Sequence, residues 1–309
     1  PLLTVGRMGA KVEWMPLFRD GEIAVRNIRL FDLDANIHAD SVGATPNYQF
    51  LIDAFKKEED NDSTQLPDIH INTLLVRNAN IHYDIDSAPQ TPDVFNPNHI
   101  AIEGLNASAS LKSLTADSLS VVLRDLSLTE QSGFRVDDVH FRLTASKEQA
   151  SLMGLALDLP NSKLVADTLT VDLQPQLHLK GTIRPSVINP SDLAAFYPAL
   201  RSVDTKLRLQ TTFDSDADRI DVERFALNTP RKDIDILLDG DATLKPTADQ
   251  RIQSHIERLT VTDEGWNLIN TMGTAFVGAK WETTGGTLKD RVGNIAVNGD
   301  VQLTKPSSI

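Results

Sequence analysis

The stretch "IHINTLLVRNANIHYDI", residues 69–85, alternates apolar and polar side chains over most of its length. Successive side chains of a β-strand point to opposite faces of its sheet, so this alternation predicts a strand with one dry and one wet face. The pattern reports a dry face without identifying what covers that face. An ordinary protein core and a bound apolar molecule both remain open.

The start of this stretch belongs to an eight-residue pattern that recurs along the chain: apolar, polar, apolar, two polar, apolar, polar, apolar. Seven copies occur, and Ser254 is the one residue in their apolar slots that is not apolar. Such recurrence indicates a repetitive β structure. The copies are "IAVRNIRL" from Ile23, "IHINTLLV" from Ile69, "IAIEGLNA" from Ile100, "FRVDDVHF" from Phe134, "LVADTLTV" from Leu164, "IDVERFAL" from Ile220 and "SHIERLTV" from Ser254.

The spacing inside each copy predicts a bend. The first two apolar slots have one parity and the last two have the other, so a flat strand would point the pairs to opposite faces. One extra residue at the central polar pair, as in a β-bulge, returns all four side chains to one face and bends the strand. Each copy is therefore predicted to be a bent strand with a concave apolar side.

The copies start 30 to 56 residues apart, which leaves room for two or three strands with their turns. Short inserted helices are expected near residues 46–57, 191–202 and 263–272, on the spacing of their apolar residues. Ser191 is the expected cap of the second helix, Pro198 should shorten it, and Gly273 should end the third. The expected organisation is a first β segment over residues 1–190 and a continuing one over 191–309.

Composition limits the classes of partner. The 309 residues carry a net charge of −13 and no cluster of Lys and Arg, which argues against binding to nucleic acid or to an anionic membrane surface. The absence of cysteine excludes disulfides and thiolate chemistry. No window has the roughly 20 apolar residues of a membrane span. Because the chain opens on Pro1, it is expected to be a piece whose signal or anchor segment lies elsewhere.

No motif in the chain predicts catalysis, a metal or a cofactor. No two histidines have the helical spacing of a zinc site, and no nucleophile or phosphate-binding motif occurs. Asp214, Asp216 and Asp218 have calcium-loop spacing, but Arg219 and Phe225 stand where such a loop needs Gly and Glu. A turn rich in aspartate is the expected structure there, and the chain is not expected to be an enzyme.

Several segments, in this order, resemble the AsmA-like proteins, and most closely the TamB (translocation and assembly module) family of the Bacteroidota. They are "NYQFLIDAFKKEE", "INTLLVRNANIHYDIDSAPQTPDVFNPNHI", "LTEQSGFRVDDVHFRL", "NPSDLAAFYPAL" and "TDEGWNLINTMGT". The resemblance covers essentially the whole chain. It rests on strand patterns and carries no catalytic signature.

The resemblance implies a bridge-like lipid-transfer protein with an open, taco-shaped β groove, anchored in the inner membrane and crossing the periplasm of a Gram-negative bacterium. It further implies that phospholipid acyl chains move along the groove towards the outer membrane. A role in outer-membrane protein assembly with a barrel partner of the TamA or BamA type, through regions outside this chain, is also implied. The candidate groove-lining residues are Ile23, Val25, Ile28, Leu30, Ile69, Ile71, Leu74, Val76, Ile100, Ile102, Leu105, Phe134, Val136, Val139, Phe141, Leu164, Leu169, Val171, Ile220, Val222, Phe225, Leu227, Ile256, Leu259 and Val261.

Two alternatives stay open from the sequence. The same apolar slots could close on each other as the core of a β-sandwich or β-helix, which would make a scaffold or an adhesin. A β-solenoid enzyme acting on carbohydrate would need a cluster of carboxylates on one sheet, and the carboxylates of this chain are dispersed.

Overall fold

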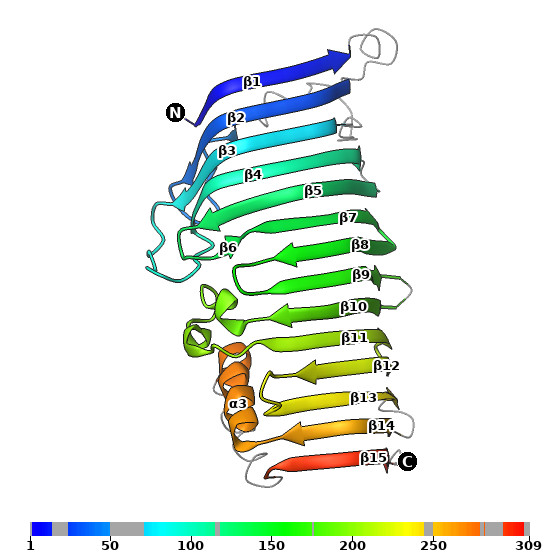
Figure 1. Ribbon diagram of the computed structural model, residues 1–309. Coiled ribbons are helices and arrows are strands. Elements are labelled where there is room, and N and C mark those ends of the chain that lie inside the picture. The colour runs from blue at the N-terminus through cyan, green and yellow to red at the C-terminus, as the bar shows by residue number, and fades with distance from the viewer. Residues whose placement is uncertain are drawn as a thin grey trace. The chain divides into compact units, whose positions relative to one another are not determined.

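The computed structural model describes residues 2–13, 24–49, 71–114, 118–174, 176–243, 250–278, 281 and 293–305. These residues are mainly β-strand, in an open sheet of linear strand order, which confirms the expected fold class (Figure 1). The chain divides into two compact units, Pro1–Thr144 and Ala145–Ile309. The segment boundary expected after residue 190 therefore falls inside the second unit.

In the first unit the strand order along the sheet follows the chain, with β6 as a short addition beside β5. The pair β2–β3 is parallel, and β1–β2, β3–β4, β4–β5 and β5–β6 are antiparallel. A parallel pair needs a long crossover, which residues 40–70 supply. The strands are β1 Leu3–Glu13, β2 Ala24–Ala39, β3 Ile71–Ile85, β4 His99–Leu114, β5 Ser118–Glu130, β6 Arg135–Val136 and β7 Asp138–Ser146.

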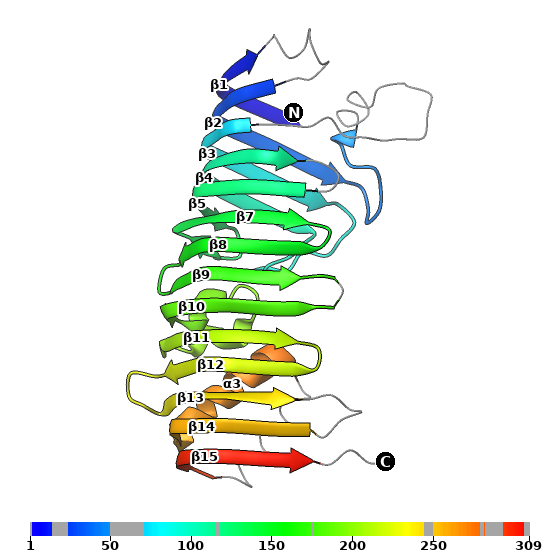
Figure 2. The ribbon, with the colours of Figure 1, turned by 90° about the vertical axis from the view of Figure 1, so that its right-hand side faces the viewer.

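In the second unit, eight strands follow one another in chain order, and all their pairings are antiparallel. Helical segments interrupt them after β10 and after β14. In Figure 2 these segments lie behind the strands. The elements are β8 Gln149–Asp158, β9 Lys163–Asp172, β10 His178–Ile188, η1 Pro190–Leu193, η2 Pro198–Ser202, β11 Leu207–Asp216, β12 Arg219–Asn228, β13 Ile234–Thr243, β14 Gln250–Val261, α3 Asp263–Val277 and β15 Ile295–Lys305.

The bulge predicted at the central polar pair of each repeat copy is confirmed in the register. Six copies have a register shift at that pair, for example around Glu223 in β12 and Glu257 in β14. The remaining copy, which starts at Phe134, breaks at Asp137, between β6 and β7. A bulge leaves one residue unpaired and increases the local bend. The copies thus keep their four apolar slots on one face.

The first unit has a second bend that the repeat pattern did not predict. Asp32 in β2 and Asn78 in β3 have positive φ angles of 52° and 56°. Gly104 in β4, with a φ of 61°, belongs to the predicted bulge of the copy from Ile100 and lies beside them in the sheet. The amide of Asn78 donates to the carboxylate of Asp32 over 2.7 Å. The backbone N–H of Gly104 donates to Asn80 over 3.2 Å. These left-handed residues lie at a bend, and Figure 1 shows β2 to β5 curving near one end.

Two of the helix expectations need correction. The segment near 191–202 is two short 3-10 helices, because Pro190 and Pro198 each start a new turn, and the capping side chain is Asn189 in place of Ser191. The third helix does not stop at Gly273 but runs to Val277, where Gly278 adopts φ 74°. Gly273 stays helical and packs against Trp281. The helix expected near 46–57 falls from residue 50 onward outside the described residues.

Candidate functional site

The register of the second unit aligns apolar residues in rows that cross the strands. Residues directly opposite each other on antiparallel strands lie on the same face. Ile220 on β12, for example, faces Ala242 on β13, which faces Ile252 on β14. Five such rows occur in the unit, as the register shows. They make one face of the sheet continuously apolar.

We number the rows from the end of the strands where β14 begins. Row 1 contains Ala150, Val171, Leu179, Ser215, Ile220, Ala242, Ile252 and Leu303. Row 2 contains Leu152, Leu169, Gly181, Phe213, Val222, Gly240, Ser254 and Val301. Row 3 contains Leu155, Ala166, Ile183, Thr211, Phe225, Leu238, Ile256 and Gly299. Row 4 contains Leu157, Leu164, Leu209, Leu227, Ile236, Leu259 and Val297, and row 5 contains Ile188, Leu207, Ile234, Val261 and Ile295.

The residues between rows 1 and 2 are polar on every strand of this unit. They form a row of their own on the opposite face, because side chains alternate along each strand. This row contains Ser151, Thr170, Lys180, Asp214, Asp221, Asp241, Gln253 and Gln302. The unit therefore has one apolar and one polar face at these rows.

Exposure changes along the apolar face from one strand end to the other. In row 5, Leu207, Ile234 and Val261 are buried, with exposures of 8%, 1% and 4%. In row 1, Val171 is half-buried, and the other large side chains are exposed, from 37% at Leu179 to 58% at Leu303. Most large side chains of rows 2 to 4 are half-buried, and Ala166, Thr211 and Ile256 of row 3 are buried. Within the described residues, no element therefore fully covers rows 1 to 4.

Helix α3 covers row 5. A Cβ atom on Gly265 would lie 3.1 Å from the Cγ1 atom of Ile234, so the first turn of the helix rests on this row. Trp266 is buried, and its indole N–H donates to the carbonyl of Gly293 over 2.7 Å. Thr262 caps the helix by accepting from the N–H of Gly265. The apolar face is thus closed at one end of the strands.

The two 3-10 helices extend this cover. Leu200 is fully buried, and Ala195 and Val203 beside it are also buried. Tyr197 meets Phe276 of α3 edge to face, with 4.8 Å between ring centroids. Both rings are partly exposed, so this contact lies at the surface. The helices pack on each other as well as on the sheet.

The first unit has comparable apolar rows with more complete burial. One row contains Val5, Leu33, Ala79 and Leu105, and another contains Met8, Leu30, Val76, Ala107 and Leu126. Leu33, Val76 and Ala79 form a buried cluster, while Leu3 and Met8 on β1 are exposed. The middle of this face is a packed core.

The register places many of the candidate groove residues in these rows. The ten candidates of the second unit fall into rows 1 to 5, and most are half-buried. In the first unit, Leu30, Val76 and Leu105 lie in the two rows named above, and Leu74 pairs with Ile28 and Ala109 in a neighbouring row. Ile102 pairs with Ile81, and Ile100 pairs with Tyr83. Val136 is buried, and Phe134, Val139 and Phe141 are half-buried. Ile23 and Ile69 lie outside the described residues, as do the side chains of Val25 and Ile71.

Sequence reasoning missed the strands between the repeat copies. Leu179, Phe213 and Leu238 complete the rows but belong to strands without the full eight-residue pattern. Their signal was simple alternation, as in "HLKGTI" and "IDILLDGD". Alternation applied to every strand would have found them.

Histidines on the polar face pair with aspartates of neighbouring strands. The ring of His178 lies 3.0 Å from an oxygen of Asp172 and 2.6 Å from one of Asp214, and these two hydrogen bonds raise the pKa of His178, that to Asp214 more. The hydrogen bond to Asp300 likewise raises the pKa of His255. Asp172 has a lowered pKa because it accepts hydrogen bonds from Gln149 and from His178.

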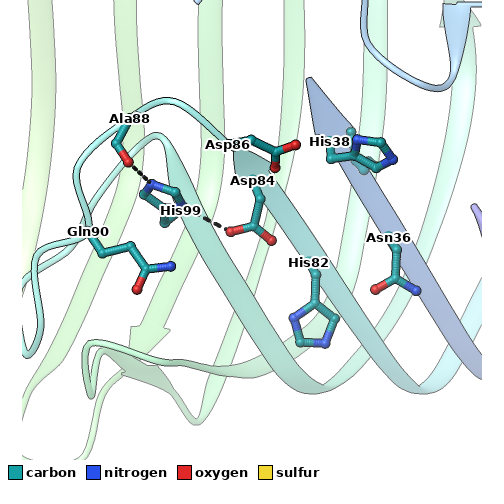
Figure 3. A pocket seen from close by; sticks show the side chains of 9 residues that line it. Asn36, His38, His82, Asp84, Asp86, Ala88, Gln90 and His99 are labelled. Atoms are coloured by element: carbon teal, nitrogen blue, oxygen red, sulfur yellow. Dashed lines mark hydrogen bonds and ion pairs between the residues drawn. The ribbon is translucent and has the colours of Figure 1, made fainter. Parts of the chain in front are cut away.

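A polar pocket of about 710 Å³ lies on the first unit, under the loop between β3 and β4 (Figure 3). His99 is buried there, and its ring nitrogens lie 2.9 Å from Asp84 and 3.0 Å from the carbonyl of Ala88. Both hydrogen bonds raise the pKa of His99, the one to Asp84 more. His38 and His82 also line the pocket. In the described part of the chain, no group of three or more such side chains is arranged to hold a metal ion.

Comparisons of the chain with protein-family models, curated proteins and solved structures found no match. Among the described residues, no helix has the length and hydropathy to cross a membrane.

Proposed function

We propose that the apolar face binds lipid acyl chains, and that the chain is the periplasmic part of an AsmA-like or TamB-like protein that carries phospholipid between the inner and outer membranes. The observation that carries this proposal is the set of half-buried apolar rows across the second unit, which end in the exposed row 1. Contact with an acyl chain would remove this surface from water. Each methylene so buried contributes about 0.8 kcal/mol.

The chemistry of the rows fits acyl chains in general. Their side chains are mostly aliphatic, so they offer dispersion and burial without directional groups. Selection of one headgroup does not follow from such a face. A role in outer-membrane protein assembly, with a barrel partner, belongs to the same proposal and is supported by the sequence resemblance alone.

Photocrosslinking tests the proposal. A benzophenone amino acid at Val222, in row 2, is compared with one at the adjacent Asp221, which lies in the polar row of the other face. Phospholipid recovered from position 222 and not from 221, in cells that contain the full-length protein, is the expected result. If a folded protein yields no lipid at either position, the lipid-binding proposal is wrong.

A second candidate function, a closed β scaffold, is favoured by the packed core of the first unit. Leu33, Val76 and Ala79 are buried by neighbouring side chains and leave little apolar surface free. A crosslinker at Leu74, half-buried beside this cluster, separates the two functions. Lipid at Leu74 would extend the groove into the first unit, and protein crosslinks alone would make that unit a scaffold.

A further inference from the structure

The helical cover closes only one end of the apolar face, and this asymmetry has a consequence for any ligand in the groove. The first turn of α3 lies on Ile234 of row 5, whereas most large side chains of rows 1 to 4 are half-buried or exposed and row 1 is the most exposed. A ligand therefore has access to large side chains in each of rows 1 to 4, and not to the buried Leu207, Ile234 and Val261 of row 5.

The first turn of α3 makes close contacts with the residues that flank row 5. A Cβ atom on Gly265 would lie only 2.2 Å from the carbonyl oxygen of Asp233, so the helix and the start of β13 are already in close contact. The N–H of Thr262 donates to that same carbonyl over 2.9 Å. Trp266 bridges to Gly293, just before β15. These contacts hold the first turn of α3 against the residue before β13 and tie the indole of Trp266 to the segment before β15.

The accessible length can be compared with an acyl chain. Rows 1 to 4 are separated by three steps of two residues, and at about 3.3 Å per residue they span roughly 20 Å. Half of the approximately 30 Å hydrocarbon core of a bilayer is about 15 Å, the depth that one lipid tail fills. A tail of ordinary length therefore fits along the strands within these four rows. A much longer tail would reach α3.

The polar end of the lipid fixes the direction. Burying a headgroup without hydrogen-bond partners is costly, so the headgroup must stay at the hydrated end, beside row 1. The terminal methyl group then points towards row 5. We propose that α3, through Trp266, is a stop that sets the longest acyl chain the second unit accepts; this rests on the lipid-binding function proposed above.

The test compares the lengths of bound chains. Purified protein is incubated with phosphatidylethanolamine vesicles that carry palmitoyl or lignoceroyl chains, and bound lipid is quantified by native mass spectrometry. The wild-type protein is expected to prefer the palmitoyl lipid by at least about tenfold. Trp266→Ala should reduce that preference by a similar factor, because it opens row 5. Trp266→Phe keeps a ring at this position and should preserve the preference.

A second variant shortens the accessible face without changing Trp266, so its result does not depend on whether Trp266→Ala folds. Leu259 is half-buried in row 4, and Leu259→Phe adds bulk there, which should shift the preference towards myristoyl over palmitoyl chains. If folded Trp266→Ala or Leu259→Phe binds lipid with the wild-type length profile, the stop is refuted and the lipid groove stands. If the wild-type protein binds no lipid of any length, the proposed function itself fails.

Discussion

Asn78 shows how a single residue shapes the first unit. Its φ of 56° lies in the left-handed region, which costs a residue with a side chain about 1–2 kcal/mol and is worst for β-branched residues. Its amide offsets part of this by donating to Asp32 over 2.7 Å, and its N–H donates to Asn106 over 3.2 Å.

Asn78→Val is therefore expected to lower the free energy of unfolding by about 2 kcal/mol, through backbone strain and the lost hydrogen bond to Asp32. Asn78→Gly loses the same side-chain hydrogen bond but relaxes the backbone, so it should destabilise less than half as much. Urea unfolding of the two variants checks this order. Equal destabilisation would mean that the hydrogen bond, and not the bend, matters at this position.

His178 predicts a pH dependence. Its hydrogen bonds to Asp214 and Asp172 raise its pKa above the ordinary 6.5, so its stabilising contribution is complete below that value. The contribution is lost as the pH rises through the raised pKa. The melting temperature should therefore fall between about pH 6 and about pH 8.5 by more in the wild-type protein than in His178→Gln. An identical fall in both would show that His178 is not protonated in the folded protein.

The candidate site was predictable residue by residue only in part. The repeat placed Val222, Phe225 and Leu259 on one face, because an eight-residue pattern with a bulge constrains four side chains at once. It did not find Leu179, whose strand has no full copy of the pattern. The repeat also did not predict how exposed each side chain is, since burial depends on which element covers a row.

At the scale of elements, α3 depends on close contact more than on helix propensity. Gly265→Ala would raise the intrinsic helix propensity by about 1 kcal/mol, yet the new methyl group would collide with the carbonyl of Asp233. We expect a net destabilisation of about 1–3 kcal/mol, measured by thermal unfolding. Asn267→Ala, on the exposed side of the same helix, should be neutral or slightly stabilising. A stabilised Gly265→Ala variant would contradict the packing described for α3.

The helices were also the elements that sequence reasoning located least well. A glycine such as Gly273 often marks the C-terminal end of a helix. Here α3 continues past it, because packing against Trp281 holds that turn in the helix. Pro198 was recognised as a disruption, but the 3-10 geometry on either side of it depends on tertiary contacts such as the burial of Leu200. By contrast, the bulges were predictable because they follow from side-chain parity alone.

At the scale of the whole molecule, the continuous apolar face predicts that one charge disrupts function without unfolding the sheet. Val222→Asp places a carboxylate in row 2, which is half-buried, so the backbone pairing should survive. Bound phospholipid should fall by at least about tenfold, because an ion among acyl chains is strongly unfavourable. Lipid extraction from the purified variant measures this, with circular dichroism as the folding check. Asp221→Asn, on the polar face, should bind lipid normally, and normal binding by Val222→Asp would remove row 2 from the groove.

The linear strand order has a kinetic consequence for how the polypeptide acquires its structure. In the second unit every strand pairs with its neighbour in the sequence, and most of these pairs require closure of only a short loop; the pairs β10–β11 and β14–β15 have longer connections that contain the helical segments. Proteins dominated by such local contacts fold quickly for their size. The parallel β2–β3 pair instead has to wait for the connection over residues 40–70 to be made. We therefore expect the strands of the second unit to pair one after another during synthesis. In the first unit, formation of the β2–β3 pair is expected to be the slowest step of folding.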